Sequence, residues 1–239
     1  MLLAIDIGNS NITLGGIQEG EILFEARLAT DATKTSDEYG VEIKDMLDLF
    51  GARVEEIRDC IVASVVPPVF NSVRNGIVKL TGKEPMVVGP GIKTGINILL
   101  EDPGATAADL IAAAVAAVDT YPTPLTVVDM GTATTIAVID DGNAFLGGAV
   151  LPGLRISAEA LSSRASLLPG IQLERPRRAI GKNTVECMQS GLMFGAAAMV
   201  DGLIDRMEAE LGRPTTVVAT GGVARFVVCL LYTSPSPRD

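Results

Sequence analysis

The chain has 239 residues, a formal charge of -10 and a hydrophobic fraction of 48%, with no histidine or tryptophan. Its acidity and few aromatic residues argue against binding nucleic acid, because phosphate backbones attract Lys and Arg, and stacked bases need aromatic side chains. The missing histidines exclude Ser-His-Asp and Cys-His nucleophiles, and three scattered cysteines form no zinc motif.

The first residues, Met1 to Asp6, carry no basic region before their apolar run, so we expect no signal peptide. The longest apolar stretch, residues 105–118, contains Asp109 and is too short to span a bilayer. We therefore expect a protein of the reducing cytoplasm, with no membrane partner.

In the first half of the chain, alternating apolar residues and turn signals predict strands and helices in succession. Glu19-Gly20 is a hairpin signal, Ser36-Asp37-Glu38 a helix cap, and Pro67-Pro68 a helix start. The predicted strands are residues 2–6, 11–17, 21–29, 60–65 and 86–88, and the predicted helices are residues 36–50 and 67–80.

Asp102-Pro103 predicts the start of an alanine-rich helix that carries Asp109 in its second turn. Ala105 and Ala113, one turn away on either side, leave room for a ligand or a close-packed helix. Asp109 is then either a solvent-facing carboxylate or a general base beside a substrate hydroxyl.

A second set of elements follows Pro122-Thr123-Pro124, with Asp141-Gly142 as its hairpin turn and Gly221-Gly222 closing its last strand. The predicted strands are residues 125–129, 134–139, 144–151 and 215–219, and the predicted helices are residues 153–163 and 184–211.

The two halves resemble one another, because residues 4–11 align with residues 127–134. Asp6 matches Asp129 and Gly8 matches Gly131 at one offset. The glycine of the second turn is displaced by one residue from that offset. Each half continues through an apolar strand, an acidic-glycine turn and another strand. The pattern predicts a duplicated β-β-β-α unit.

The two Asp-x-Gly turns can bind phosphate, since glycine allows close backbone approach and successive N–H groups form an anion-binding nest. Nearby hydroxyls add donors, and the aspartates suit a hydrated Mg²⁺. One such turn alone is more often an ordinary hairpin, but two at equivalent positions favour phosphate binding. The hydroxyls are those of Ser10, Thr132, Thr134 and Thr135.

Other phosphate motifs are missing from the sequence: no P-loop, dinucleotide fingerprint or protein-kinase signature occurs. Thr220-Gly221-Gly222 either lets an adenine or ribose lie against bare backbone or is a simple strand end.

Together these motifs resemble the type III pantothenate kinases of the actin, Hsp70 and sugar-kinase superfamily. The match extends in family order from residue 1 to about residue 225. Its stretches are Asp6-Ile-Gly-Asn-Ser-Asn11, Ser64-Val-Val-Pro67, Ala108-Asp109, Asp129-Met-Gly-Thr-Ala-Thr134, Gly147-Gly-Ala-Val-Leu-Pro-Gly153, Gly181-Lys-Asn-Thr184, Ser190-Gly191 and Ala219-Thr-Gly-Gly222.

The resemblance implies an α/β fold of two ribonuclease-H-like (actin-like ATPase) halves, each a mixed sheet with flanking helices, and ATP bound in the cleft. We expect the halves at residues 1–115 and 116–228. It further implies a homodimer that transfers the γ-phosphate of ATP to the 4′-hydroxyl of pantothenate, the first step towards coenzyme A. Phosphoryl transfer depends mainly on positioning and charge neutralisation, which agrees with the residues present.

By this resemblance Asp109 is the catalytic base, Asp6 holds Mg²⁺, and Asp129 holds a monovalent cation, K⁺ or NH₄⁺. The expected ATP-binding residues are Asp6, Ile7, Gly8, Asn9, Ser10, Asn11, Ile12, Thr13, Gly131, Thr132, Gly221 and Gly222. The expected acceptor-binding residues are Ala107, Ala108, Asp109, Leu110 and Thr184.

Three departures from the family pattern bear on the acceptor and on the end of the chain. Leu110 replaces an arginine suited to pairing the substrate carboxylate, and Leu100 replaces a frequent tyrosine. Either another cation binds that carboxylate, or the acceptor is another small alcohol; a non-catalytic nucleotide-binding regulator is a third reading. Beyond Arg225 the match ends, and we expect residues 229–239 to be a non-native, disordered tail of a truncated frame.

Overall fold

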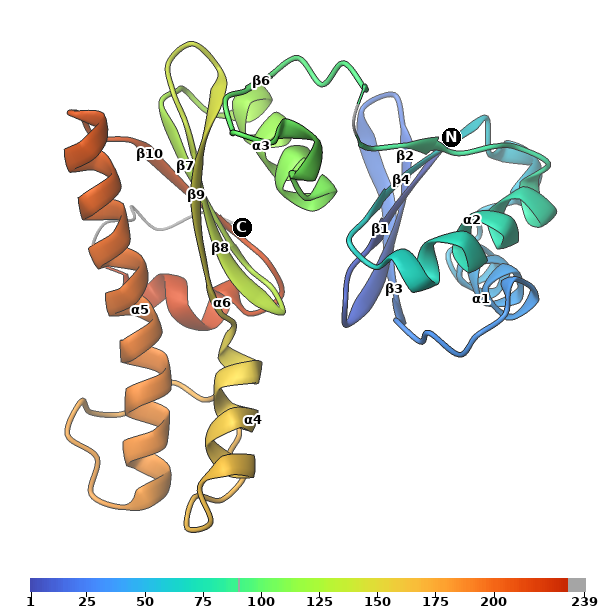
Figure 1. The fold of residues 1–239 in the computed structure, drawn as a ribbon. Helices are drawn as coiled ribbons and strands as arrows, with labels where there is room; N and C mark the ends of the chain where they lie inside the picture. The colour runs from blue at the N-terminus through green and yellow to red at the C-terminus, as the bar shows by residue number, and fades with distance from the viewer. Residues whose placement is uncertain (90, 232–239) are drawn as a thin grey trace. The chain divides into compact units, whose positions relative to one another are not determined.

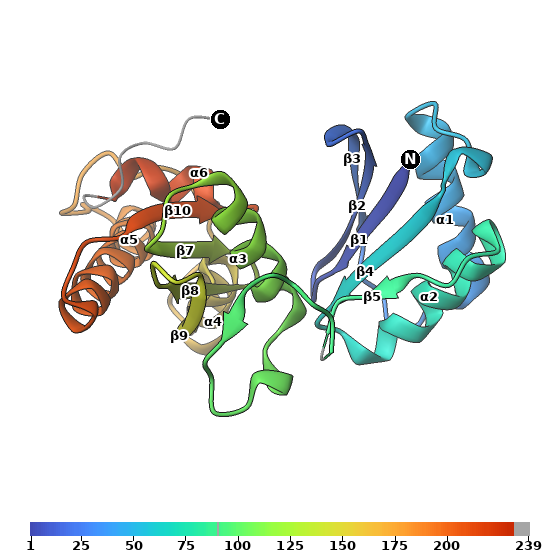
Figure 2. The same ribbon diagram turned by 90° about the horizontal axis from the view of Figure 1, so that it is seen from above.

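The computed structural model describes residues 1–89 and 91–231, and most of the predicted tail lies outside them. The chain divides into two compact units, residues 1–94 with 102–112, and residues 95–101 with 113 onwards. Each unit is built on one five-stranded mixed sheet, as Figures 1 and 2 show from two directions.

The first sheet has the strand order β3-β2-β1-β4-β5, in which β1 pairs antiparallel with β2 and parallel with β4. The predicted strands and helices of this unit are confirmed. Their bounds are β1 Leu2–Ile7, β2 Asn11–Gln18, β3 Glu21–Ala29, β4 Asp59–Ser64, β5 Met86–Val87, α1 Ser36–Leu49 and α2 Pro67–Thr81.

One face of this sheet is covered by α1 and α2 (Figure 1). Along β1 the side chains alternate, so Leu3, Ile5 and Ile7 enter that core while Asp6 lies exposed on the opposite face. The alternation therefore exposes the first aspartate of the repeat instead of burying it.

The cap of α1 lies one residue before the predicted position. Thr35 is the N-cap, its hydroxyl accepting from the Glu38 backbone N–H at 3.3 Å, and the Glu38 carboxylate accepts from the Thr35 N–H at 2.7 Å. This reciprocal capping box satisfies two backbone donors, which a cap at Ser36 could not do with Glu38.

The α1 and α2 helices meet at two glycines. A Cβ on Gly76 would lie 2.8 Å from the Ser36 carbonyl oxygen and 3.0 Å from the Gly40 nitrogen. Both neighbours are backbone atoms and cannot rotate away, so the helices can approach this closely only because Gly76 lacks a side chain.

We expect opposite stability effects from one substitution at two helical glycines. Gly76→Ala should destabilise the protein by about 1–3 kcal/mol, because the helices must separate. At Gly195 in α5, an added Cβ meets no described atom within 4 Å, so Gly195→Ala should stabilise by about 1 kcal/mol through helix propensity. Chemical denaturation of both variants measures the difference, and equal effects would contradict the close-packing interpretation.

The second sheet has the order β10-β7-β8-β9-β6. The predicted strands and helices are again found, with β6 as an addition, because a two-residue strand has no readable periodicity. The bounds are β6 Asn97–Ile98, β7 Leu125–Met130, β8 Ala133–Ile139, β9 Ala144–Pro152, β10 Thr216–Thr220, α3 Ala108–Thr120, α4 Leu154–Arg164, α5 Thr184–Leu211 and α6 Ala224–Val227.

The α5 helix lies on one face of this sheet and the part of α3 from residue 113 lies on the other (Figures 1 and 2). By length and composition α5 could cross a bilayer, a property that the sequence analysis overlooked. Met193, Val200 and Ile204 of α5 are nevertheless buried against Val128 and Ile136 of the sheet. This packing is that of a core helix.

The two units repeat one topology. In each, the first strand pairs antiparallel with the second and parallel with the fourth, so β1, β2, β3 and β4 correspond to β7, β8, β9 and β10. The repeat inferred from the sequence is confirmed at this level.

Candidate functional site

The turn after β1 consists of Gly8 to Asn11, which lie between the paired residues Ile7 and Ile12. The Gly8 N–H donates to the Asn11 carbonyl at 3.0 Å, and a Cβ on Gly8 would lie 3.1 Å from that oxygen. Asn9 and Ser10 are exposed at its tip. A small, exposed turn of this kind leaves backbone donors accessible to an anion.

Thr30, the residue after β3, makes two hydrogen bonds to this turn. Its hydroxyl donates to the Gly8 carbonyl at 2.7 Å and its N–H donates to the Ser10 carbonyl at 3.2 Å. The sequence analysis missed Thr30. Its signal is a hydroxyl residue directly after β3, the strand that pairs with β2 next to the turn.

Two residues of the expected ATP-binding stretch belong to the core. Ile7 and Ile12 have no exposed surface and pack with α1 and α2. Only their backbone groups remain for ligand contact, whereas the side chains of Asp6, Asn9, Ser10 and Asn11 are exposed and that of Thr13 is half-buried.

The turn after β7 repeats this arrangement with one residue fewer. Gly131 to Ala133 lie between the paired residues Met130 and Thr134, and the Gly131 N–H donates to the Ala133 carbonyl at 3.0 Å. The shorter turn explains the displaced hairpin glycine, because Asp6 and Asp129 differ by 123 positions whereas Gly20 and Gly142 differ by 122.

Once the difference in turn length is taken into account, both sheets place an Asp opposite a Thr. Asp6 faces Thr13 across β1 and β2, and Asp129 faces Thr135 across β7 and β8. Directly opposite residues on antiparallel strands project from the same face, about 5 Å apart at Cβ. An Asp–Thr pair therefore flanks each glycine turn of the repeat, with the Asp before the turn and the Thr after it.

Two glycines pack against the Asp129 turn. A Cβ on Gly153, at the start of α4, would lie 2.0 Å from the Thr132 carbonyl oxygen. Gly221 has φ +99°, and its Cβ would lie 2.5 Å from Asp129 Oδ1. Both contacts join segments distant in sequence, and both require glycine. Gly153, the last residue of the Gly147–Gly153 family stretch, is thus part of the support for this turn.

Asp109 lies in the first turn of α3, not the second as predicted. Asp102 and Pro103 do begin a helical turn, but it is a separate short 3₁₀ helix, Pro103–Ala105, capped by the Asp102 carboxylate. The α3 helix then starts afresh at Ala108. Asp109 is half-buried, and its Oδ1 accepts from the Leu110 N–H at 2.7 Å.

The residues next to Asp109 in the sequence include one buried hydroxyl. The Thr106 hydroxyl, three residues earlier, is buried and finds no hydrogen-bond partner among the described residues. Ala107 and Leu110 are half-buried, and Ala108 is buried. Residues 106–110 thus contain one buried hydroxyl and no Lys or Arg.

Leu100, which replaces the family's tyrosine, is half-buried near Gly147 of β9. A Cβ on Gly147 would lie 3.4 Å from Leu100 Cδ2. Leu100 therefore serves as an apolar contact in the second unit.

The Gly181-Lys-Asn-Thr184 motif builds the start of α5. The Asn183 side chain accepts from the Glu186 N–H at 2.9 Å, and the Glu186 carboxylate accepts from the Lys182 N–H at 2.9 Å. A Cβ on Gly181 would lie 2.5 Å from the Cys187 nitrogen. These contacts give most of the motif a structural role and leave Thr184 exposed at the helix end.

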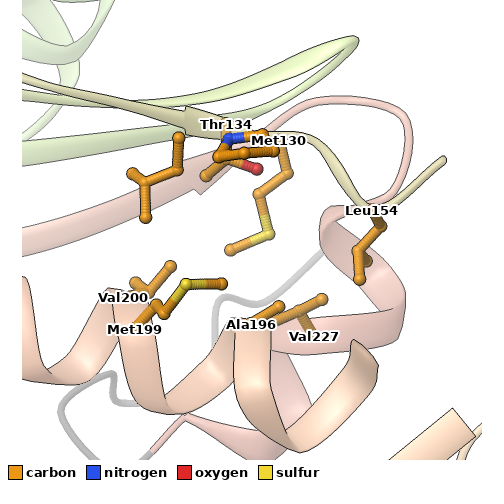
Figure 3. Close-up of a pocket in the computed structure, with 9 residues that line it drawn as sticks. Met130, Thr134, Leu154, Ala196, Met199, Val200 and Val227 are labelled. Atoms are coloured by element: carbon orange, nitrogen blue, oxygen red, sulfur yellow. The ribbon is translucent and has the colours of Figure 1, made fainter. Parts of the chain in front are cut away.

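A small cavity under α5, of about 10 Å³, is lined by apolar side chains and by Thr134 (Figure 3). It can hold about one water molecule and no nucleotide. Thr134 is buried here, on the face away from Asp129 and Thr135, so it does not supply the expected phosphate donor.

A larger hollow of about 280 Å³ lies where the loop before α5 meets the first turns of that helix. Arg175, Arg177 and Arg178 line it together with Val185 and Glu186, next to Thr184 in the sequence. Three exposed guanidinium groups make it suited to an anion.

Among the described residues no cluster of three or more Cys, Asp or Glu side chains could hold a metal. A divalent ion bound through one carboxylate and substrate phosphates needs no such cluster, and the exposed Asp6 beside its turn fits that mode. The monovalent cation expected at Asp129 stays a prediction, and the Thr135 hydroxyl on the strand opposite finds no hydrogen-bond partner among the described residues.

The sequence profile of the type III pantothenate kinase family matches residues 2–206. Among solved structures, one described as a Baf family transcriptional activator from Campylobacter jejuni is 18% identical, with a TM-score of 0.61 over 97% of this chain and 89% of that one.

Two sugar-kinase structures are also similar. The ROK hexokinase from Thermus thermophilus is 14% identical, with a TM-score of 0.51 over 94% of this chain and 82% of that one. A protein described as an N-acetylglucosamine kinase from Porphyromonas gingivalis is 13% identical, with a TM-score of 0.52 over 97% and 89%. At such identities the likeness shows the fold alone, which is the expected actin-like ATPase architecture of two mixed sheets with flanking helices.

Proposed function

Because the chain belongs to the type III pantothenate kinase family, we propose that it transfers the γ-phosphoryl group of ATP to the 4′-hydroxyl of pantothenate in the cytoplasm. The observation that carries this proposal is the repeat itself: each unit presents an Asp–Thr pair behind a glycine turn closed by a 3.0 Å hydrogen bond. A single hairpin of this kind is ordinary, whereas two matched ones are suited to a polyphosphate.

In the proposed reaction, backbone N–H groups of the Gly8 and Gly131 turns, with Asn9, Ser10 and Thr132, bind the phosphates. The Asp109 carboxylate accepts the proton of the acceptor hydroxyl as that oxygen bonds to the γ-phosphorus and ADP leaves. Mg²⁺, when bound at Asp6 and the phosphates, supplies charge neutralisation. Gly221 and Gly222 offer bare backbone to the nucleoside.

We further propose a homodimer. The α4 helix packs beside the first half of α5 (Figure 1), and large apolar side chains are exposed on these helices and on the loop that joins them. A second copy of the chain would cover them and bring Thr184 to the acceptor, as the family resemblance implies. The exposed residues are Ile156, Leu161, Leu167, Ile180 and Val185.

A coupled ADP-release assay with and without pantothenate tests the function. Stimulation of ADP release by pantothenate supports it. ATP turnover stimulated only by other small alcohols would instead support a different acceptor, which the absence of a cation at Leu110 favours. ATP binding with no stimulation by any alcohol would indicate a non-catalytic regulator.

Leu110→Arg tests acceptor recognition directly. If pantothenate is the acceptor, an arginine one residue after Asp109 should pair with the pantothenate carboxylate. The KM for pantothenate should then fall by about tenfold or more, since a charge-assisted hydrogen bond contributes about 1.5–3 kcal/mol. Steady-state kinetics at saturating ATP measure this effect. An unchanged KM would show that the carboxylate is already bound elsewhere, for which the arginines of the hollow beside Thr184 are the candidates.

A further inference from the structure

In both units, the residue directly after the third strand lies against the glycine turn that follows the first strand. In the first unit this residue is Thr30, whose hydroxyl donates to the Gly8 carbonyl at 2.7 Å and whose N–H donates to the Ser10 carbonyl at 3.2 Å. In the second unit it is Gly153, where a Cβ would lie 2.0 Å from the Thr132 carbonyl oxygen. The repeat therefore keeps one position against the turn carbonyls, and the first unit fills it with a hydrogen-bonding side chain.

The two hydrogen bonds from Thr30 fix the direction of two backbone donors. The peptide bonds of this turn are trans, and in a trans peptide the C=O and the N–H point in opposite directions. Since the Gly8 and Ser10 carbonyls both point at Thr30, the N–H groups of Asn9 and Asn11 point away from it. If either peptide unit rotated, it would present a carbonyl oxygen to a bound phosphate in place of an N–H.

Thr30 is itself restrained by a tyrosine of α1. The Tyr39 hydroxyl accepts from the Asp31 N–H at 3.0 Å and donates to the Asp31 carbonyl at 2.8 Å, and its side chain has no exposed surface. The Asp31 N–H belongs to the same peptide unit as the Thr30 carbonyl, so the bond to Tyr39 opposes rotation of that unit. A core residue thus supports the exposed turn through Asp31 and Thr30.

We propose that Thr30 and Tyr39 are positioning residues for the nucleotide, because they keep the N–H groups of Asn9 and Asn11 directed at its phosphates. This inference rests on the proposed function, in which the turn that begins at Gly8 binds ATP. Neither side chain has to touch the nucleotide. Donors that are already oriented bind an anion more tightly, because they need not reorient on binding.

Calorimetric titration of the whole chain with ADP and Mg²⁺ tests the role of Thr30. Thr30→Val preserves the shape of the side chain but removes the hydroxyl, and it should weaken ADP binding by about fivefold, the usual effect of one hydrogen bond. Thr30→Ser retains the hydroxyl and should bind ADP like the wild type. Wild-type affinity in Thr30→Val would overturn the proposal.

Thr81→Val is the matched control. The Thr81 hydroxyl also donates to a backbone carbonyl at 2.8 Å, that of Ile77 in α2, and Thr81 is half-buried like Thr30. The control removes the same kind of bond away from the turn, so it should bind ADP like the wild type. Equal losses of ADP affinity in Thr81→Val and Thr30→Val would indicate general destabilisation and overturn the positioning role.

Tyr39→Phe tests the second residue, since it removes only the hydroxyl. It should also weaken ADP binding. The double variant Thr30→Val/Tyr39→Phe should lose less affinity than the two single losses combined, because both residues act on one turn. Independent, additive losses would overturn the assignment of Tyr39.

The ADP titration contains no acceptor, so it is separate from the pantothenate assay. Weaker ADP binding by Thr30→Val, but not by Thr30→Ser or Thr81→Val, supports the positioning role even if pantothenate fails to stimulate ADP release. A wild-type chain that does not bind ADP overturns the positioning role together with the proposed nucleotide site.

Discussion

Replacing Asp109 by Asn should reduce phosphoryl transfer to the acceptor by about 10²–10⁴-fold, the usual contribution of a positioned general base. The substitution preserves the shape of a half-buried side chain at the start of α3 but removes its basicity. The kcat should fall while the KM for ATP stays within about twofold, because no phosphate-binding group has been altered.

The matched control lies on the same helix. Asp119 is exposed near the end of α3, and Asp119→Asn changes the net charge equally. Its activity should equal that of the wild type. Retention of full activity by Asp109→Asn would remove Asp109 from the mechanism and favour a nucleotide-binding regulator.

Gly221→Ala should weaken nucleotide binding by at least about tenfold. Alanine at φ +99° is strained by about 1–2 kcal/mol, and its methyl group would lie 2.5 Å from Asp129 Oδ1. The variant can relieve the clash only by moving the carboxylate or the end of β10, and either movement disturbs the Asp129 turn. Titration of ADP by calorimetry measures the loss.

Gly195→Ala serves as the control for this experiment, since it adds the same methyl group in open space on α5. It should bind ADP like the wild type. Unaltered ADP affinity in Gly221→Ala would mean that the Thr220-Gly221-Gly222 segment is a structural strand end, the other interpretation that the sequence allowed.

Local signals predicted most of the fold. Strands such as β1 and β7 combine an apolar alternation with a following glycine turn, and these features depend on neighbouring residues only. The predicted start of α3 was wrong, because Asp102-Pro103 has the composition of a helix cap whether the helical turn continues or stops after Ala105. The two-residue β6 strand left no periodicity to read.

The parts of the site that depend on distant contacts could not be predicted. Aspartates and glycines of both turns were visible as a repeated motif, but the pairing of Asp129 with Thr135 depends on a turn length that sequence alone leaves open. Positions 153 and 221 must be glycine because atoms of another segment lie too close for a side chain, and the residues adjacent in sequence give no sign of this contact. Similarly, the Gly181-Lys-Asn-Thr184 stretch was read only as a family motif, and the capping of α5 by Asn183 and Glu186 was not predicted.

The unequal lengths of the two turns have a consequence for engineering. Because side chains alternate along a strand, one residue inserted between Thr134 and Thr135 would turn Thr135 to the α5 side. An insertion in the turn between Met130 and Thr134 would leave the β7–β8 pairs unchanged. The first repeat already tolerates such a longer turn. Loop grafts at either position can therefore vary the number of backbone amides in the turn while the Asp and Thr that flank it stay paired.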